Sequence, residues 1–173
     1  NNAWRVIEHW SDMVYPHDFP TDRLPKKLTT GQRLIDETHF VPAQNHYGGF
    51  VYAGGTMAYT AAYWALREYT PDEISFIGCD MHYPETGPTH FYGTGTPDPL
   101  REDISLTSLE GSSARFLCLA ARQNCVVFNL SNSPSRLIFP RKSPHASHQS
   151  TPLPVIDTKM VEDCLQTEHR LGY

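Results

Sequence analysis

The sequence lacks the features that would place it in several common protein classes. No apolar run approaches the roughly 18 residues of a membrane-spanning helix, so an integral membrane protein is excluded. Lysine and arginine total only 14 against 19 acidic residues, the net charge is −5, and no basic run is longer than the pair Lys26-Lys27. A nucleic-acid-binding surface requires clustered basic residues, so this charge balance argues against nucleic acid as a partner.

Cysteine is scarce as well, with four residues and no Cys-x-x-Cys pair. Cys79, Cys118 and Cys125 lie in apolar segments that are typical of buried thiols, whereas Cys164 does not. We therefore expect reduced cysteines in a cytoplasmic protein, and a peripheral attachment at the inner membrane face is compatible with the same composition. The chain begins with Asn1 rather than Met, which is compatible with a first strand that precedes it.

The first third of the chain predicts two strands and little helix. Residues 4–10 alternate apolar and polar side chains and are rich in β-forming types. Residues 33–41 form a second strand region, which ends at Pro42. Between the two, residues 11–27 contain three prolines and predict a loop.

Two helix–strand pairs follow. Apolar residues recur at helical spacing over residues 56–69 and 105–124, and each helix leads into an apolar run, at 74–79 and 125–130. The segment at 80–102 is rich in Gly, Pro and Thr, and a loop of this length usually serves as a lid or a binding loop.

This order of elements predicts the α/β class, as a Rossmann-like three-layer sandwich with a mostly parallel central sheet. At 173 residues the chain has the length of one domain with a substantial core. We assign residues 1–139 to that domain, residues 140–154, rich in Pro, Ser and His, to a linker, and residues 155–173 to a C-terminal helix.

A glycine pair opens the first of these helices, in the order Gly54-Gly55-Thr56. Glycines let the backbone approach an anion closely, and a helix N-terminus offers free N–H groups and the positive end of the helix dipole. The same residues also fit a tight turn into the helix with Thr56 as its cap. They form neither a P-loop nor a complete dinucleotide-binding motif, so both interpretations stay open.

The first apolar strand ends in Gly78-Cys79-Asp80. If this strand belongs to a parallel sheet, Asp80 lies at its carboxyl end, where α/β folds collect their binding groups. The carboxylate would there accept hydrogen bonds from sugar hydroxyls or orient a base. The alternative is a loop aspartate that caps the N–H groups of the residues after it.

Two histidines, His82 and His90, lie in the long loop. The same loop also contains the polar or aromatic residues Tyr83, Glu85, Tyr92 and Thr94. Imidazole is a natural general base near neutral pH, so either histidine is a candidate to take the proton of an acceptor hydroxyl. Nine histidines are spread along the chain, however, and most such residues are polar surface. Metal ligation by Asp80, His82 and His90, with His46, is a further option, although the spacing has no compact metal signature.

These segments resemble the bacterial CMP-sialic-acid-dependent sialyltransferases (glycosyltransferase family 42) and the related MptE-like Rossmann proteins. The family has a Ser-Gly turn that opens a helix, a strand that ends Ser-Gly-Ile-Asp-Phe-Tyr, and a later Ser-His-Tyr-x-Gly-His segment. The corresponding segments here are Gly54-Gly55, Ile77-Gly78-Cys79-Asp80-Met81-His82-Tyr83 and Thr89-His90-Phe91-Tyr92-Gly93-Thr94, with Ser131-Asn132-Ser133 where the family has an Asn-Ser exit. The resemblance covers residues 50–140 and is one of pattern, with few identities.

The resemblance implies a nucleotide-sugar pocket lined by Gly54, Gly55, Gly78, Asp80 and His82, with Ser131 to Ser133 nearby. Such enzymes transfer the sugar of a CMP donor by direct displacement, with a histidine as the base and without a metal. The family's catalytic histidine corresponds to Thr94 here, and His90 matches the histidine before it. Either His90 or His82 therefore takes the role, or the chain is not an active sialyltransferase. The family's Gly-Asn-Gly-Pro-Ser motif is absent.

We expect a glycosyltransferase-like domain that transfers a sugar from a nucleotide-sugar donor to a glycan or small-molecule acceptor without a cofactor. The candidate catalytic residues are His90, His82 and Asp80, and the candidate substrate-binding residues are Gly54, Gly55, Thr56, Gly78, Tyr83, Tyr92, Thr94, Ser131, Asn132 and Ser133. One alternative is an MptE-like pyrophosphokinase, which would need magnesium and a carboxylate pair such as Asp80 and Glu85. Another is a Rossmann module that binds a nucleotide or a partner without chemistry.

Overall fold

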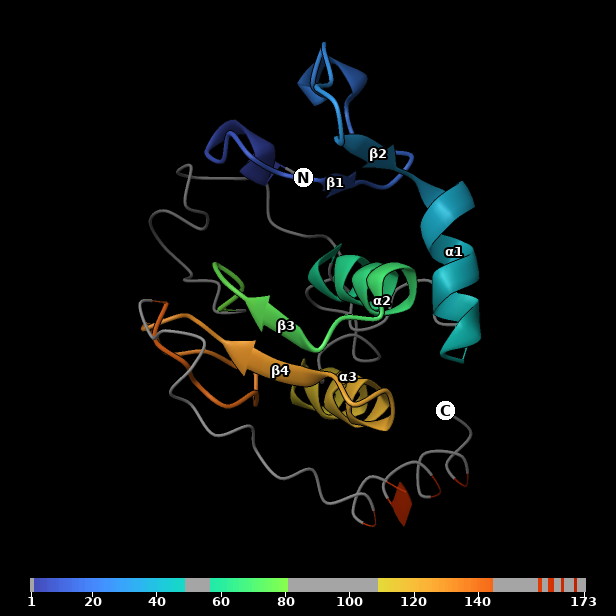
Figure 1. The fold of residues 1–173 in the computed structure, drawn as a ribbon, viewed down its shortest axis with the longest axis vertical. Helices are drawn as coiled ribbons and strands as arrows, with labels where there is room; N and C mark the ends of the chain where they lie inside the picture. Colours follow the sequence, from blue (N-terminus) through green and yellow to red (C-terminus); the bar gives the residue numbers. More distant parts are fainter. Residues whose placement is uncertain are drawn as a thin grey trace. The chain divides into compact units, whose positions relative to one another are not determined.

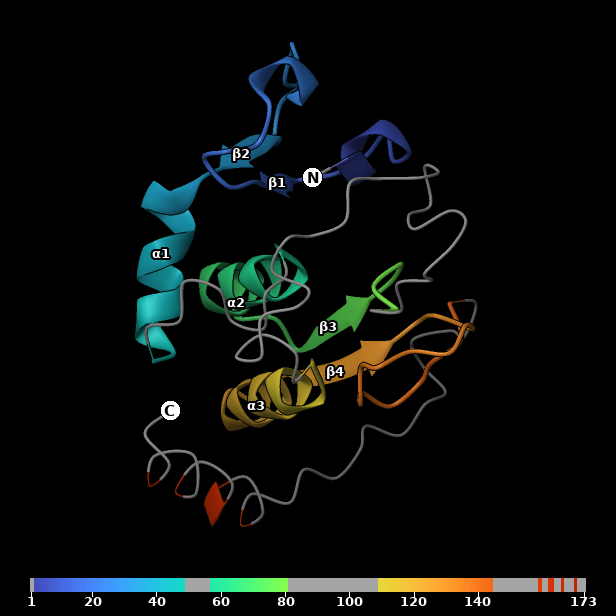
Figure 2. The same ribbon diagram turned by 180° about the vertical axis from the view of Figure 1, so that it is seen from behind.

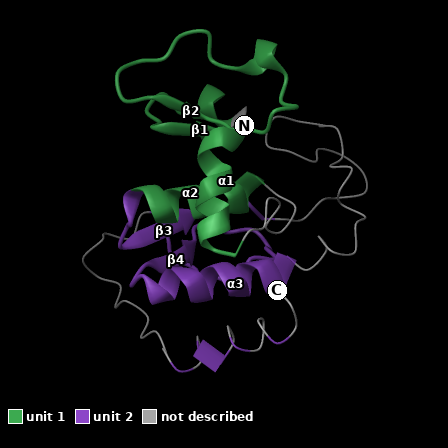
Figure 3. Ribbon diagram, turned by 90° about the vertical axis from the view of Figure 1, so that its right-hand side faces the viewer, with its two compact units in different colours: residues 1–68 green, residues 69–173 purple. Residues whose placement is uncertain are grey.

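The structure is a computed structural model in which residues 2–48, 57–80 and 109–144 are described, together with positions 159, 162, 163, 166 and 170. The chain divides into two compact units, residues 1–68 and residues 69–173, which are coloured separately in Figure 3. Each unit contains a pair of parallel strands and at least one α-helix. The mixed α/β class that the sequence predicts is therefore confirmed, and the described strands form two separate two-stranded sheets.

Unit 1 is built around a short parallel strand pair. Its elements in chain order are a 3-10 helix (Asn2–Arg5), strand β1 (Asp12–Val14), a second 3-10 helix (Thr21–Arg23), strand β2 (Arg33–Ile35), helix α1 (Glu37–His46) and helix α2 (Met57–Tyr69), whose last residue lies beyond the unit boundary. In the strand pair, Asp12 lies opposite Arg33 and Val14 lies opposite Ile35. The pair thus has a charged amino end and a buried, apolar carboxyl end.

The transition from β2 to α1 is set by Asp36. Its side chain accepts hydrogen bonds from the backbone N–H of Thr38 at 3.0 Å and from the Thr38 hydroxyl at 2.6 Å, as an N-cap does. The strand predicted over residues 33–41 is therefore wrong beyond Ile35, because this cap begins a helix at Glu37. Pro42 does not end an element but lies inside α1, at the cost of one backbone hydrogen bond.

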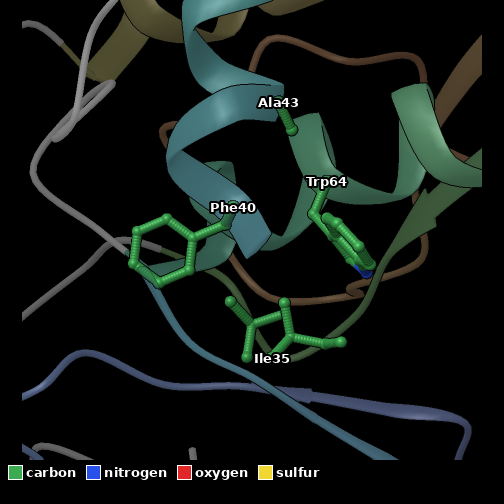
Figure 4. Close-up of a cluster of buried hydrophobic side chains, with 5 residues drawn as sticks. Ile35, Phe40, Ala43 and Trp64 are labelled. Atoms are coloured by element: carbon green, nitrogen blue, oxygen red, sulfur yellow. The ribbon is translucent and has the colours of Figure 1, made fainter. Parts of the chain in front are cut away.

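The core of unit 1 lies where β1, β2, α1 and α2 meet. Buried side chains from all four elements form one cluster, which contains Val14, Ile35, Phe40, Ala43 and Trp64. Figure 4 shows the labelled side chains of β2, α1 and α2 in this cluster. The Trp64 indole N–H also donates to Asp12 at 2.7 Å, and the Arg33 guanidinium lies over the Trp64 ring. This single residue therefore connects the apolar cluster to the charged end of the strand pair.

Unit 2 contains a strand–helix–strand unit. Its described elements are strand β3 (Glu73–Phe76), helix α3 (Leu109–Arg122) and strand β4 (Val126–Asn129). The two strands pair in parallel, from Glu73 opposite Val126 to Phe76 opposite Asn129, and both views of the ribbon show them side by side (Figures 1 and 2). All four residues of β4 are buried, as in the central strands of parallel sheets.

The core of unit 2 is aromatic. The Phe116 ring of α3 is fully buried and meets the Phe76 ring at 5.8 Å and the Phe139 ring at 6.1 Å between centroids. The described residues confirm the predicted helices at 56–69 and 105–124, as α2 and α3, and the predicted strands at 74–79 and 125–130, as β3 and β4. Predictions from long periodic patterns are correct here because each of these elements buries one continuous apolar face.

Residues 140–142, called the strap below, pair with Asn129, the last residue of β4. The Asn129 N–H donates to the carbonyl of Pro140 at 2.8 Å, and the Lys142 N–H donates to the carbonyl of Asn129 at 3.1 Å. The Lys142 ammonium, 7% exposed, forms an ion pair with both carboxylate oxygens of Glu73 at 2.8 and 3.1 Å. The strap forms a single parallel bridge to β4, between Arg141 and Asn129.

Three further predictions need correction. Residues 4–10 form no strand; Val6 and Ile7 are 66% and 48% exposed, so the alternating pattern meets no sheet that would bury it. The predicted loop at 11–27 contains β1, because Met13 and Val14 are buried against other elements of unit 1. Strand β3 ends at Phe76, and Ile77 is 63% exposed.

Other expectations concern the membrane, the cysteines and the C-terminal helix. Within the described residues no helix combines the length and the apolar character that crossing a membrane requires. Three described cysteines, Cys79, Cys118 and Cys125, are free thiols, as predicted, and Cys164 lies outside the described residues. The five described positions between 159 and 170 are helical and exposed, in agreement with a helix there.

Candidate functional site

The segments that leave β3 and β4 meet at one end of the sheet of unit 2. We call residues 77–80 and 130–136 the carboxyl edge. Since Phe76 and Asn129 are register partners at the ends of parallel strands, their exit segments begin side by side (Figure 1). Two backbone hydrogen bonds join these segments, from Leu130 N–H to the Phe76 carbonyl at 2.8 Å and from Arg136 N–H to the Asp80 carbonyl at 3.0 Å. The carboxyl ends of parallel strands are where α/β folds bind ligands.

Gly78 turns the chain away from β3. Its φ of +68° lies in the left-handed region, which residues with a side chain rarely adopt. A Cβ at this position would meet nothing within 4 Å, so the backbone conformation and not crowding requires glycine here. The turn brings Asp80 next to the segment that leaves β4.

Asp80 has a carboxylate oxygen in an unusual environment. Atom Oδ1 is buried and has no hydrogen-bond partner within the described part of the chain. An unsatisfied buried polar atom costs about 1–3 kcal/mol, and more when it belongs to a charged group. Burial raises the pKa of the neighbouring Cys79 thiol, and the Asp80 carboxylate raises it further, so Cys79 stays protonated and unreactive at neutral pH.

Asn129, the last residue of β4, is a second buried polar group at this edge. It is 1% exposed; its Oδ1 accepts from the Ser131 N–H at 2.9 Å, while its Nδ2 has no partner among the described residues. Sequence reasoning missed this residue. The available signal was a single amide side chain at the end of the apolar run that becomes β4.

The loop after β4 uses most of its own backbone donors. The Ser133 N–H donates to the Ser131 hydroxyl at 3.2 Å, and the Leu137 N–H donates to the Ser135 hydroxyl at 3.1 Å. The Ser131 hydroxyl therefore has a contact within the turn. It keeps a donor and a second acceptor lone pair, so its predicted ligand contact stays a prediction. The side chains of Asn132 and Ser133 are exposed and remain available to a ligand.

The first turn of α3 also reaches the carboxyl edge. The Arg136 guanidinium forms a two-bond ion pair with Glu110, from Nε at 2.7 Å and from the terminal nitrogen at 2.8 Å. Glu110 lies in the first turn of α3, where an acidic side chain also interacts favourably with the helix dipole. Arg136 thus connects three segments. It belongs to the exit of β4, its backbone N–H donates to the exit of β3, and its side chain pairs with α3.

The structure places five of the residues predicted for the site in the two exit segments of the β3–β4 sheet. These are Gly78 and Asp80 after β3, and Ser131, Asn132 and Ser133 after β4. The other predicted site residues lie outside the described residues: Gly54, Gly55, Thr56, His82, Tyr83, His90, Tyr92 and Thr94. These include two of the four ligands of the metal alternative, His82 and His90. His46, also considered as a ligand, lies in unit 1 with its ring against Tyr47.

The side chains of the carboxyl edge are suited to bind neutral polar groups of a ligand. They offer a carboxylate oxygen, an amide and hydroxyls, whereas the backbone N–H groups of residues 131, 133, 136 and 137 are already paired. Such groups recognise hydroxyls, while a phosphate requires free N–H groups or unpaired cations. Comparison with known protein families, with curated proteins and with solved structures finds no match to this chain.

Proposed function

We propose that this chain is a Rossmann-like domain that binds a nucleotide sugar and transfers the sugar to an acceptor hydroxyl. The observation that carries the proposal is the buried carboxylate oxygen of Asp80, without a partner in the described residues, at the carboxyl edge of a parallel strand pair. A group that costs folding free energy is maintained where a ligand satisfies it. In the proposed fold, β3 and β4 belong to the central sheet of a three-layer sandwich.

The carboxyl edge supports a role in holding the hydroxyl groups of the donor. A carboxylate accepts from the two neighbouring hydroxyls of a ribose, which is how acidic residues hold ribose in many α/β nucleotide-binding proteins. Asn132 and Ser133 are exposed in the exit segment of β4 and supply further donors and acceptors. Because the described loop has few free backbone donors, we assign the phosphate to Gly54, Gly55 and Thr56 at the start of the preceding helix.

The catalytic step is assigned to the histidines of the long loop. His90 is the proposed base that deprotonates the acceptor hydroxyl, with His82 as the second candidate, and the leaving nucleotide keeps its phosphate oxygen. If this role is correct, His90→Ala abolishes sugar transfer while donor binding is retained. Transfer at the wild-type rate by His90→Ala would remove His90 as the base.

Ligand-induced thermal stabilisation tests the proposal directly. Wild-type protein is screened with CMP, CDP, UDP, GDP and ATP, each with and without magnesium, and compared with Asp80→Asn and with the control Asp72→Asn. Asp72 has the same side chain but is exposed and lies before β3, at the opposite end of the strand. Loss of a hydrogen bond to a charged group should weaken binding about 10- to 100-fold in Asp80→Asn, and the control should bind as the wild type does.

Each result of the screen has a distinct meaning. Stabilisation by a cytidine nucleotide without metal supports the proposal. Stabilisation by ATP that depends on magnesium would indicate the MptE-like pyrophosphokinase instead. Stabilisation by none of the nucleotides would contradict both enzymatic functions, and equal binding by Asp80→Asn and wild type would remove Asp80 from the site.

A further inference from the structure

The side chain of Arg141, a residue outside the loop after β4, binds two backbone carbonyls of that loop. The Arg141 guanidinium donates from one terminal nitrogen to the carbonyl of Ser131 and from the other to the carbonyl of Ser133, each at 2.8 Å. The two carbonyls flank Asn132. A planar guanidinium is suited to this contact, because its fixed fork places two donors at a set spacing. One residue therefore fixes the backbone on both sides of an exposed amide side chain.

Arg141 is itself firmly anchored. It lies in the strap, where it pairs with Asn129 as a parallel bridge to β4. The next residue, Lys142, is almost fully buried; its ammonium pairs with Glu73 and lies 4.9 Å from the centroid of the Phe128 ring. Separating such a buried charge from its partner is costly. The Lys142–Glu73 ion pair therefore fixes the position of the strap relative to the sheet. The base of the Arg141 side chain is thus fixed relative to the sheet.

We propose that Arg141 is a positioning residue, which holds Asn132 and Ser133 in the orientation that the ligand requires. The inference rests on the proposed function, because these residues matter only if the carboxyl edge binds a ligand. The loop has no regular structure of its own, and its internal hydrogen bonds are turn contacts between near neighbours. Without Arg141 its two outward carbonyls would bind water, and the loop would sample other conformations.

Hydrogen exchange of the intact chain tests the positioning directly, without any ligand. The variants are Arg141→Ala and Arg141→Lys, with Arg122→Ala as the control. Arg122→Ala removes the same charge, and Arg122 is exposed in the last turn of α3. We expect amides of residues 130–137 to exchange about tenfold faster in Arg141→Ala, with Arg141→Lys between it and the wild type because an ammonium cannot span both carbonyls. Unchanged exchange in Arg141→Ala would overturn the proposal.

A binding measurement separates positioning from general stability. CMP is titrated into the same variants, and Arg141→Ala should bind about tenfold more weakly than the wild type while its melting temperature matches that of Arg122→Ala. Low-millimolar guanidinium, far below denaturing concentrations, should restore affinity to Arg141→Ala alone. Wild-type affinity in Arg141→Ala, despite faster exchange, would overturn the role of Arg141. If the wild type binds no CMP, the proposed donor fails, and the exchange result still decides whether Arg141 positions the loop.

Discussion

The strand pairs of the two units both end in polar segments, but those segments differ in how their polar groups are paired. After β2 in unit 1, the Asp36 carboxylate accepts from Thr38 and from the His39 ring at 2.7 Å. The Glu37 carboxylate accepts from the N–H of His17 and lies 3.3 Å from its ring. After β3 in unit 2, Asp80 Oδ1 is buried and has no partner among the described residues.

We propose that this difference reflects different roles, structural after β2 and ligand-binding after β3. At the exit of β2 the acidic side chains are paired and stabilise the start of α1. The buried unpaired atoms among the described residues of unit 1, Trp4 Nε1 and Gln44 Oε1, lie outside this exit and carry no charge. In unit 2 the Asp80 carboxylate oxygen Oδ1 adds nothing to stability in the described contacts, and under the proposed function a ligand pairs with it. The comparison predicts a graded series of effects on the free energy of unfolding.

The largest effect is expected in the aromatic core of unit 2, which contains the strands that lead to the carboxyl edge. Phe116→Ala removes the fully buried ring between Phe76 and Phe139 and should lower the free energy of unfolding by about 3–5 kcal/mol, measured by urea denaturation. Phe116→Leu keeps most of the volume and should cost about 1 kcal/mol. Equal losses in the two variants would contradict the packing described here.

Asp12 provides the strongest partnered carboxylate of unit 1. It accepts from Arg33 at 2.8 and 2.9 Å and from the Trp64 indole at 2.7 Å. Asp12→Ala leaves these donors without an acceptor and should cost about 2–3 kcal/mol of unfolding free energy. Asp12→Asn retains one acceptor oxygen and should lose less. If Asp12→Ala unfolds at the wild-type urea concentration, partnered carboxylates do not stabilise unit 1.

Asp36 should show a smaller effect that depends on pH. Hydrogen bonds from Thr38 and then from His39 lower the pKa of Asp36 below its usual value of 3.8. A carboxyl group with a lowered pKa in the folded state stabilises the fold above its unfolded pKa, and this contribution is lost as pH falls through the folded value. Asp36→Ala should therefore cost about 1 kcal/mol at pH 7, and the difference from wild type should shrink below pH 3.8.

Denaturant titrations at pH 7 and at several values below pH 4 measure this dependence. The exposed Asp18 provides the matched control, since Asp18→Ala removes an equal charge from a residue outside the helix cap. A difference between wild type and Asp36→Ala that does not change with pH would show that the charged form of Asp36 is not the capping group.

The sequence predicted the elements whose signal is long and one-sided. Helices α2 and α3 and strand β4 each present a continuous apolar face, which leaves little choice of structure. Short elements were harder. The alternation in residues 4–10 is the pattern of a strand, but only a neighbouring strand could make it one, and no described residue provides that neighbour.

Local contacts also determined structure where a single residue type predicted otherwise. Pro42 predicts the end of an element, yet the Asp36 cap and the burial of Phe40 hold α1 in place through it. In the candidate site, Asp80 was predicted from its position at a strand end, and Ser131 to Ser133 from the resemblance to a family. The roles of Ser131 within the turn and of Asn129 beneath it depend on tertiary contacts that no sequence pattern encodes.

The smallest expected effect tests the central claim most directly. The free energy of unfolding of Asp80→Ala is measured beside that of Asp12→Ala, with and without the nucleotide that stabilises the wild type. Because Asp80 Oδ1 is buried without a described partner, its removal should leave stability unchanged or raise it by about 1 kcal/mol while stabilisation by the nucleotide disappears. A loss of stability as large as that of Asp12→Ala, with nucleotide stabilisation intact, would show that Asp80 is a structural residue and contradict this account.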